Sequence, residues 1–279
     1  MKRSLNYYGV VSAILLVIAA AVGVPYAAIT YGFTWVDWVT FVALYLASGF
    51  GVTVGYHRLL THRAFEVTRP VKAALLVTGA WALENSALIW CADHVRHHAC
   101  TDTEEDPYNA KKGFWFSHLG WLFVEDPHRV ERYETPFRRD ALVMWQHRNY
   151  LTLFFTGLVV PFVIGFLHRG LPGAIACFAL AGVVRVLVVL NVSFATNSIC
   201  HLWGTQPHGQ RNSSRDVPWL ALLTLGEGYH NYHHTHARDY RNGAKWHHID
   251  PSKWLIFLLE KVGAAKNLHR AQVPAPATK

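Results

Sequence analysis

Histidine is the residue type in this sequence whose number and spacing could support chemistry. The chain has 18 His, as many as its Asp and Glu residues together. Half of them follow short patterns: HRLLTH at 57–62, HVRHH at 94–98, HNYHH at 230–234, and His201 one helical turn after Asn197. The neutral imidazole ring is a common ligand of iron, zinc, copper and nickel. The clusters therefore indicate a metal site.

The spacing within the clusters indicates how the rings could converge. Histidines at positions i, i+3 and i+4, as in the second and third clusters, lie on one face of a helix. His57 and His62 are five residues apart, about 140° around an ideal helix, so they converge only if the helix ends or bends there. Eight or nine convergent rings exceed the coordination of one ion, which implies two metal ions.

The elements that carry these histidines have the composition of a membrane protein. Hydrophobic residues make up 52% of the 279 residues and charged residues only 16%, against about 25% in soluble domains. This composition excludes intrinsic disorder, and the long uncharged blocks argue against a soluble globule. With so much apolar sequence, the net charge of +8 favours a membrane surface over nucleic acid as the partner. The four Cys form no CxxC pair, which favours a reducing compartment.

Four apolar stretches predict membrane-spanning helices, which makes the expected fold an all-α membrane protein. The stretches cover about 9–29, 35–56, 150–168 and 171–191. The short turn at 168–170 makes the last two an antiparallel pair, so the four helices form two transmembrane hairpins. The run 73–83 is too short to span and is expected to lie at the interface. Arg185, in the last span, is expected to snorkel toward the cytoplasmic boundary.

The distribution of positive charge predicts the orientation of the spans. Lys2 and Arg3 precede the first span, the 30–37 loop has no Lys or Arg, and the two long polar stretches hold nearly all the others. The positive-inside rule then places both termini and a helical cap, formed by 57–149 and 192–265, in the cytoplasm. We expect one integral-membrane domain over 1–265, with a histidine-rich di-metal site in the cap, and a disordered tail over 266–279. Solvated histidines on amphipathic helices would not explain three clusters on one side of the membrane.

The three clusters, in this order, resemble the histidine boxes of the membrane fatty acyl desaturases, and the resemblance runs from about residue 35 to about 260. DPYNAKKGFWFSHLGWLF at 106–123, NSICHLWG at 197–204 and GEGYHNYHH at 226–234 resemble the carbon-9, stearoyl-CoA type branch. The family fold, four transmembrane helices and a cytosolic cap with a di-iron centre, agrees with the topology above. The resemblance implies two Fe ions with nine ligands: His57, His62, His94, His97, His98, His201, His230, His233 and His234. It also implies that Asn197 holds a metal through a water.

The activity that the resemblance implies is O₂-dependent desaturation of a fatty acyl chain. A cis double bond would form at carbon 9 of a saturated chain, with acyl-CoA favoured as the substrate and acyl-lipid as the alternative. An unactivated methylene has no acidic proton, so a cofactor must supply the hard chemistry. The chain has no GxGxxG, CxxCH or ferredoxin cysteine pattern. Electrons would therefore come from a separate ferredoxin, or from a small b-type cytochrome with its reductase. In a bacterium, the membrane would be the inner membrane.

The resemblance also implies a bent tunnel that holds the substrate. Trp90 would line the bend with Glu84 and Ser193 near it, and Tyr45 and Gly49 would close the far end. Lys111 and Lys112 would contact an anionic acyl head group. The sequence departs from the family at two places, where Arg96 stands next to His97 and where Glu84 replaces the amide of many stearoyl-type relatives.

Two other functions are compatible with clustered histidines. A membrane di-iron hydroxylase or alkane monooxygenase would insert oxygen, but the strings at 197–204 and 226–234 argue against it. A non-enzymatic membrane metal or haem carrier would have its ligands near mid-membrane, whereas these follow the spans. Two non-haem iron ions per chain would favour an enzyme, and haem absorption would favour a carrier.

Overall fold

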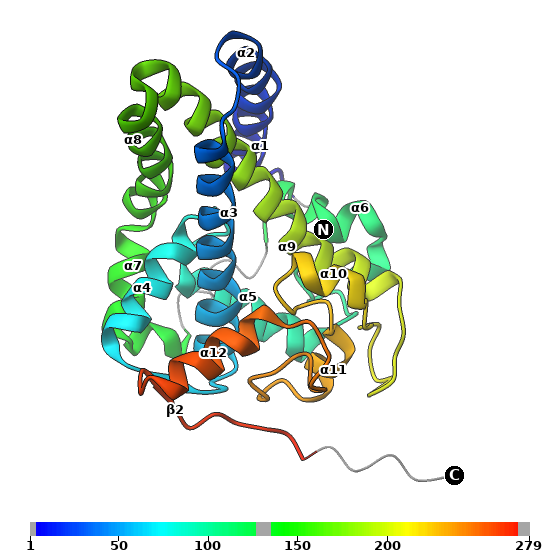
Figure 1. The fold of residues 1–279 in the computed structure, drawn as a ribbon. Helices are drawn as coiled ribbons and strands as arrows, with labels where there is room; N and C mark the ends of the chain where they lie inside the picture. The colour runs from blue at the N-terminus through cyan, green and yellow to red at the C-terminus, as the bar shows by residue number, and fades with distance from the viewer. Residues whose placement is uncertain (1–3, 127–134, 273–279) are drawn as a thin grey trace.

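The computed structural model describes residues 4–126 and 135–272, which fold mainly into helices (Figure 1). Three of the described helices are long and apolar enough to cross a membrane. The first, Tyr7–Thr30, consists of α1 (Tyr7–Ile18), the π-helix η1 (Ala19–Gly23) and α2 (Val24–Thr30). Its large apolar side chains are almost all exposed, as expected of a helix in contact with lipid.

The second long helix, Trp35–Thr61, joins α3 (Trp35–Phe50) directly to η2 (Gly51–Thr61), which is a π-helix. A capping box stands at its N-terminus. The Thr34 side chain accepts a hydrogen bond from the Asp37 backbone N–H, and the Asp37 carboxylate accepts one from the Thr34 backbone N–H. Asp37 is fully buried and lies 3.4 Å from the Arg169 guanidinium. Arg169 also donates hydrogen bonds to the carbonyls of Tyr31 and Gly32, at 3.1 and 3.2 Å. The turns at the tops of the two predicted hairpins are thus bonded together.

The third long helix, Tyr150–Leu202, consists of α8 (Tyr150–Cys177), η7 (Phe178–Val184) and α9 (Arg185–Leu202). Its backbone leaves helical geometry at Arg169 and Gly170, where Gly170 has a φ of +64° that only glycine adopts readily. The chain rises along α8 to this break and then descends through the rest of α8, η7 and α9 (Figure 1). A side chain on Gly165 would place its Cβ 2.6 Å from Cys177 Cβ, so the two arms pack closely below the turn. The structure has three candidate spans, and the fourth predicted crossing depends on counting this broken helix twice.

Arg185 does not snorkel as expected. It is fully buried, its Nε donates to the Ala181 carbonyl at 3.2 Å, and the rest of its guanidinium donates to the carbonyls of Trp81 and Gly157. A cation inside a helical bundle is less costly when backbone carbonyls replace water. Arg185 therefore fastens α8 and the turn after α4 to α9.

The cap consists of short helices and one two-stranded sheet. These elements are α4 (Arg69–Ala80), α5 (Ala87–Cys100), η3 (Ala110–Lys112), α6 (Phe114–His118), η4 (Gly120–Phe123), η6 (Pro136–Arg139), α7 (Ala141–Arg148), α10 (Pro218–Leu223), α11 (His230–Thr235), α12 (Pro251–Lys261), β1 (Glu66–Val67) and β2 (Ala265–Lys266). The apolar run 73–83 forms most of α4, which at 12 residues is too short to span. It packs on η2, since a Cβ on Gly55 would lie 3.0 Å from Leu75 Cβ.

A buried core joins the elements that carry the first two histidine clusters. It includes Val52 and Tyr56 of η2, Leu76 of α4, Leu88 of α5 and Val189 of α9. Burial of such side chains stabilises by about 1.5–3 kcal/mol each. The positions of η2 and α5 relative to α9 are therefore set by packing.

The two ends of the described chain are held by the cap. Near the N-terminus, Asn6 N–H donates to the Phe123 carbonyl and Glu125 N–H to the Ser4 carbonyl, both at 2.9 Å. Near the C-terminus, the sequence prediction of a tail beginning at 266 differs from the structure. Lys266 lies in β2, antiparallel to β1, and His269 N–H donates to the Ala64 carbonyl at 2.8 Å. Residues 273–279 lie outside the described residues.

Candidate metal centre

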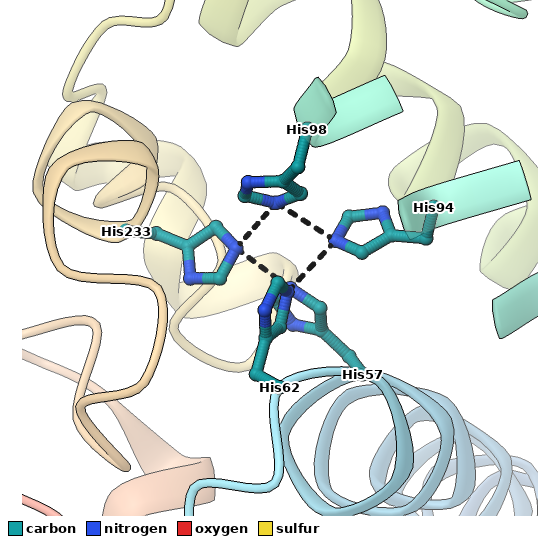
Figure 2. Close-up of side chains that lie close together, drawn as sticks. All are labelled: His57, His62, His94, His98 and His233. Carbon is teal, nitrogen blue, oxygen red and sulfur yellow. Dashed lines mark hydrogen bonds between the residues drawn. The ribbon is translucent and has the colours of Figure 1, made fainter. Parts of the chain in front are cut away.

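The nine clustered histidines form two groups. Within each group, all ligand atoms lie within 4.8 Å of one another. The first group contains His57, His62, His94, His98 and His233, and the second contains His97, His201, His230 and His234. Figure 2 shows the rings of the first group pointing toward a common centre from three segments of the chain. The sequence predicted two ions but did not divide the ligands between them.

The α-helical spacing of the second and third clusters distributes each triplet over both groups. On α5, His94 and His98 face the first group and His97 faces the second. On α11, His233 faces the first group, whereas His230 and His234 face the second. Two short helices thus hold six rings between the two sites, which explains why the sites adjoin.

The five-residue spacing of the first cluster matches a π-helix. In η2 the hydrogen bonds run from residue i+5 to residue i, and His62 N–H donates to the His57 carbonyl at 3.1 Å. Residues five apart are then much closer in angle around the axis than in an α-helix, and the two ring centroids are 4.8 Å apart. The rings converge because the helix widens over this stretch, which the ideal α-helix used for the sequence prediction does not allow.

The spacing of the ring nitrogens fits a bound metal. In the first group, successive Nε2 atoms are 2.9–3.1 Å apart around the sequence His57, His233, His98, His94, His62. In the second group, the two neighbouring Nε2 pairs that involve His230 are both 3.0 Å apart. An octahedron with metal–nitrogen bonds of about 2.1 Å has edges of about 3.0 Å. The donor atoms therefore stand at the separations of ligands around one ion.

Carboxylates accept hydrogen bonds from the Nδ1 atoms of two of these histidine rings. His57 Nδ1 lies 2.9 Å from Glu227 Oε2, and His97 Nδ1 lies 2.9 Å from Asp106 Oδ1. A carboxylate only accepts, so each Nδ1 carries the proton and each Nε2 keeps a free lone pair for a metal. His201 Nδ1 lies 2.8 Å from Ser213 Oγ, whose hydroxyl donates to Asp102. This partner shell is typical of metal-binding histidines.

His97 gives an independent test of whether these residues fit a metal. Its Nδ1 is bonded to Asp106, and its Nε2 is buried without a hydrogen-bond partner among the described residues. A buried lone pair with no donor is costly unless a cation faces it. The orphaned nitrogen points to a metal in the second group.

The ionisation of the rings also suits metal binding. Burial lowers the pKa of His94, His98, His230, His233 and His234 well below its ordinary value, and the neighbouring imidazoles lower it further. The rings are therefore neutral near pH 7, and neutral imidazole is the form that ligates a metal.

A cavity of about 550 Å³ adjoins both groups, with His57 and His94 of the first and His230 of the second in its wall. Most of its wall is apolar, as in ligand pockets of this size. Six of the predicted non-histidine site residues line it: Tyr45, Gly49, Glu84, Trp90, Ser193 and Asn197. Lys111 and Lys112 do not line it, and Lys112 Nζ instead lies 2.8 Å from Glu104.

The predicted bend and far end of the cavity have distinct contacts. Trp90 stacks on His94 with ring centroids 4.8 Å apart, and its Nε1–H donates to Glu84 Oε2 at 3.0 Å. At the predicted far end, the Tyr45 hydroxyl donates to the Leu223 carbonyl. A Cβ on Gly49 would lie 2.6 Å from Leu225 Cδ1.

The first long helix supplies a wall that the sequence analysis missed. Gly9, Ser12, Ala13 and Leu16 of α1 line the cavity. Their spacing of i, i+3, i+4 and i+7 marks one helical face, and three of the four are small residues. That stripe is the signal in the sequence that could have identified this wall.

The sequence of this chain is similar to the sequences of known proteins. A family model described as fatty acid desaturase matches residues 33–257. A probable acyl-CoA desaturase of Schizosaccharomyces pombe is 41% identical over 232 residues, which cover 82% of this chain and 48% of that protein. Stearoyl-CoA desaturase 5 of Homo sapiens is 35% identical, covering 82% and 71%. The sn-2 palmitoyl-lipid 9-desaturase of Nostoc is 34% identical, covering 80% and 78%. The chain spans about half the length of the fungal relative, and it belongs to the fatty acid desaturase family.

Proposed function

We propose that this protein is an O₂-dependent fatty acyl desaturase that introduces a cis double bond at carbon 9 of a saturated acyl chain. The observation that carries the proposal is the position of the two histidine groups on the wall of one mostly apolar cavity. The names of the relatives divide between acyl-CoA and acyl-lipid substrates. We favour acyl-CoA because the most similar relatives reported above carry that name.

The nine histidines would hold two iron ions, with Asn197 contributing through a water. Once bound, the iron ions would supply the reduction of O₂ and the removal of two hydrogens from adjacent methylenes. The chain itself fixes the imidazoles through Glu227, Asp106 and Ser213. These hydrogen bonds orient the rings and would keep the donor atoms in place between turnovers.

The cavity wall would select the reacting bond. No polar group distinguishes one methylene from the next, so position along the chain must be set by where the chain is held. Trp90, stacked on His94, would fix the segment beside the metals, and Tyr45 and Gly49 would limit the length beyond it. Lys111 and Lys112, outside the cavity, would meet an anionic head group.

The arrangement in the membrane completes the proposal. We infer four crossings, with Tyr150–Leu202 crossing twice about its break at Gly170, and both termini and the cap in the cytoplasm. Membrane lipid would surround the spans. A separate ferredoxin, or a small b-type cytochrome with its reductase, would deliver electrons to the cap.

Expression in a host that lacks its own desaturase, followed by fatty-acid profiling with double-bond location, tests the function. We expect a new cis bond at carbon 9, which a His97→Ala variant does not produce. Hydroxylated chains would instead show a monooxygenase. Unchanged lipids together with haem absorption in the purified protein would show a carrier.

A further inference from the structure

Glu84 is a carboxyl group on the wall of the cavity, and the chemistry described above gives it no role. Its residue surface is 8% exposed. One oxygen, Oε2, accepts hydrogen bonds from Trp90 Nε1 at 3.0 Å and from Ser193 Oγ at 2.9 Å. The other, Oε1, is buried and has no hydrogen-bond partner within 4–126 and 135–272. A buried carboxyl oxygen without a partner is costly, so what fills the cavity beside Glu84 affects the energy of the charged form.

The backbone holds Glu84 in this place at some cost. Its neighbours Leu83 and Asn85 both have positive φ, +63° and +75°, which is unfavourable by about 1–2 kcal/mol for a residue with a side chain such as Leu. Asn85 N–H donates to the Tyr150 hydroxyl at 3.1 Å, which fixes the turn to α8. Strain retained beside a buried polar group indicates a functional constraint on that group.

Within the described residues, the hydrogen-bond partners of Glu84 carry no positive charge. Tyr56 faces it from η2 and Tyr150 from α8, while Trp90 of α5 and Ser193 of α9 donate to it. Three other titratable groups on neighbouring elements have partners of their own: Cys91 of α5 donates to the Tyr56 carbonyl, His147 of α7 is bonded to Ser86, and Arg185 of α9 is bonded to backbone carbonyls. Burial raises the pKa of Glu84 to about 7, against which the two hydrogen bonds act. The carboxyl is therefore balanced between its two forms near neutral pH.

We propose that Glu84 takes up a proton when an acyl chain fills the cavity, so that chain binding is coupled to protonation. This inference rests on the proposed function, which supplies the acyl chain. Before binding, water in the cavity that Glu84 lines can solvate the carboxylate through the part of its residue surface that stays exposed. A bound chain replaces that water with methylenes, which can neither donate to a carboxylate nor screen it. The neutral carboxyl is then the form that the occupied cavity tolerates.

The coupling has a definite sign. Below the pKa of the free protein, Glu84 is already neutral, and chain binding takes up no proton there. Above it, each binding event takes up as much as one proton, and the dissociation constant rises by up to about tenfold per pH unit. Glutamine at the same position is neutral at every pH, so a Glu84→Gln variant lacks this dependence.

Calorimetric titration of the metal-loaded full chain with stearoyl-CoA at pH 8 tests the coupling. Titrations in two buffers with different heats of ionisation give the number of protons taken up. We expect wild-type protein to take up as much as one proton more than Glu84→Gln. The phosphates of CoA titrate equally in both, so the difference isolates Glu84. Equal uptake by the two proteins would overturn the inference and leave the proposed function standing, whereas binding by neither would overturn the proposed function and the inference with it.

A second measurement uses only wild-type protein, in case the variant does not fold. The infrared difference spectrum on adding stearoyl-CoA at pH 8 should gain the carbonyl stretch of a protonated carboxyl group. A spectrum with bound chain and without that band would also overturn the inference.

Discussion

At the scale of single residues, the two ring nitrogens of three histidines, His57, His97 and His201, have different tasks. The Nε2 atoms form the two groups, and the Nδ1 atoms of His57, His97 and His201 are held by Glu227, Asp106 and Ser213. Removing a ring removes a ligand, whereas changing a partner leaves the ligand in place and loosens its orientation. A variant that lacks a histidine ring should therefore lose more metal binding than a variant that changes the hydrogen-bond partner of a ring.

His201→Ala should abolish desaturation and lower the iron content of the purified protein. His201 lies at the end of α9 and is bonded through its ring to Ser213, so its loss leaves the helix and the membrane spans intact. His247→Ala, which changes an exposed ring in the cap, is the control and should retain both properties. Full activity and iron content in His201→Ala would exclude it as a ligand.

Asp106→Asn should weaken metal binding by about 10–100-fold without abolishing it. The amide can still accept from His97 Nδ1–H, but it lacks the negative charge that makes the ring a better ligand. Metal titration of the apoprotein measures this change. Glu105→Gln, at the adjacent exposed position, should bind metal as tightly as the wild type, and an equal loss in both variants would show a general effect of charge.

At the scale of elements, the helices show what sequence patterns predict and what they do not. Hydropathy located the apolar stretches, and the family resemblance is confirmed by the family match. The i, i+3, i+4 pattern placed each triplet of histidines on one helical face. One face is wide enough to serve two metal sites, so the pattern does not assign the rings to the two groups. That assignment depends on how α5 lies against α11 and η2. The π-helical geometry of η2 was not predicted, and its close packing through Gly55 against Leu75 is a tertiary contact that no local pattern encodes. Arg185 was misjudged because its carbonyl partners come from distant segments.

Gly49→Phe on α3 should shorten the chains that the enzyme accepts. A side chain there meets Leu225 at once, so a phenyl group would fill the end of the cavity. Activity on eighteen-carbon substrate should fall more than activity on shorter chains, with the double bond still at carbon 9. Product analysis over a series of chain lengths measures this. An equal loss at all lengths would place Gly49 away from the end of the cavity.

Gly165→Leu should destabilise the packing between the two arms of α8 on either side of Gly170 by about 1–3 kcal/mol, because the added side chain overlaps Gly173 and Cys177. Gly23→Leu is the matched control, since a Cβ there meets nothing within 4 Å. Thermal unfolding in detergent should show a lower midpoint for Gly165→Leu alone. Equal midpoints would mean that the two arms do not pack as described.

At the scale of the whole molecule, the position of the metal centre requires a single topology. All nine histidines must lie on one side of the membrane, so α4 cannot cross it. Reporters fused after His98 and at the C-terminus should both read cytoplasmic, and a reporter inserted at Gly32 should read exported. An exported reading after His98 would separate the first cluster from the second, and the two groups could then not form.

The attachment of Ser4 and Asn6 to residues 123–125 has a consequence for the order in which the protein is made. The ribosome adds about 5–20 residues per second, so α1 emerges on the order of 10 s before its partner segment does. During that interval the face of α1 with Gly9 and Ser12 has only lipid or the insertion machinery beside it. The cavity can close only after residue 125 is synthesised, and its metal ligands are complete only after His234. Loading of the proposed iron ions would therefore be a late event, set by the synthesis of the third histidine cluster.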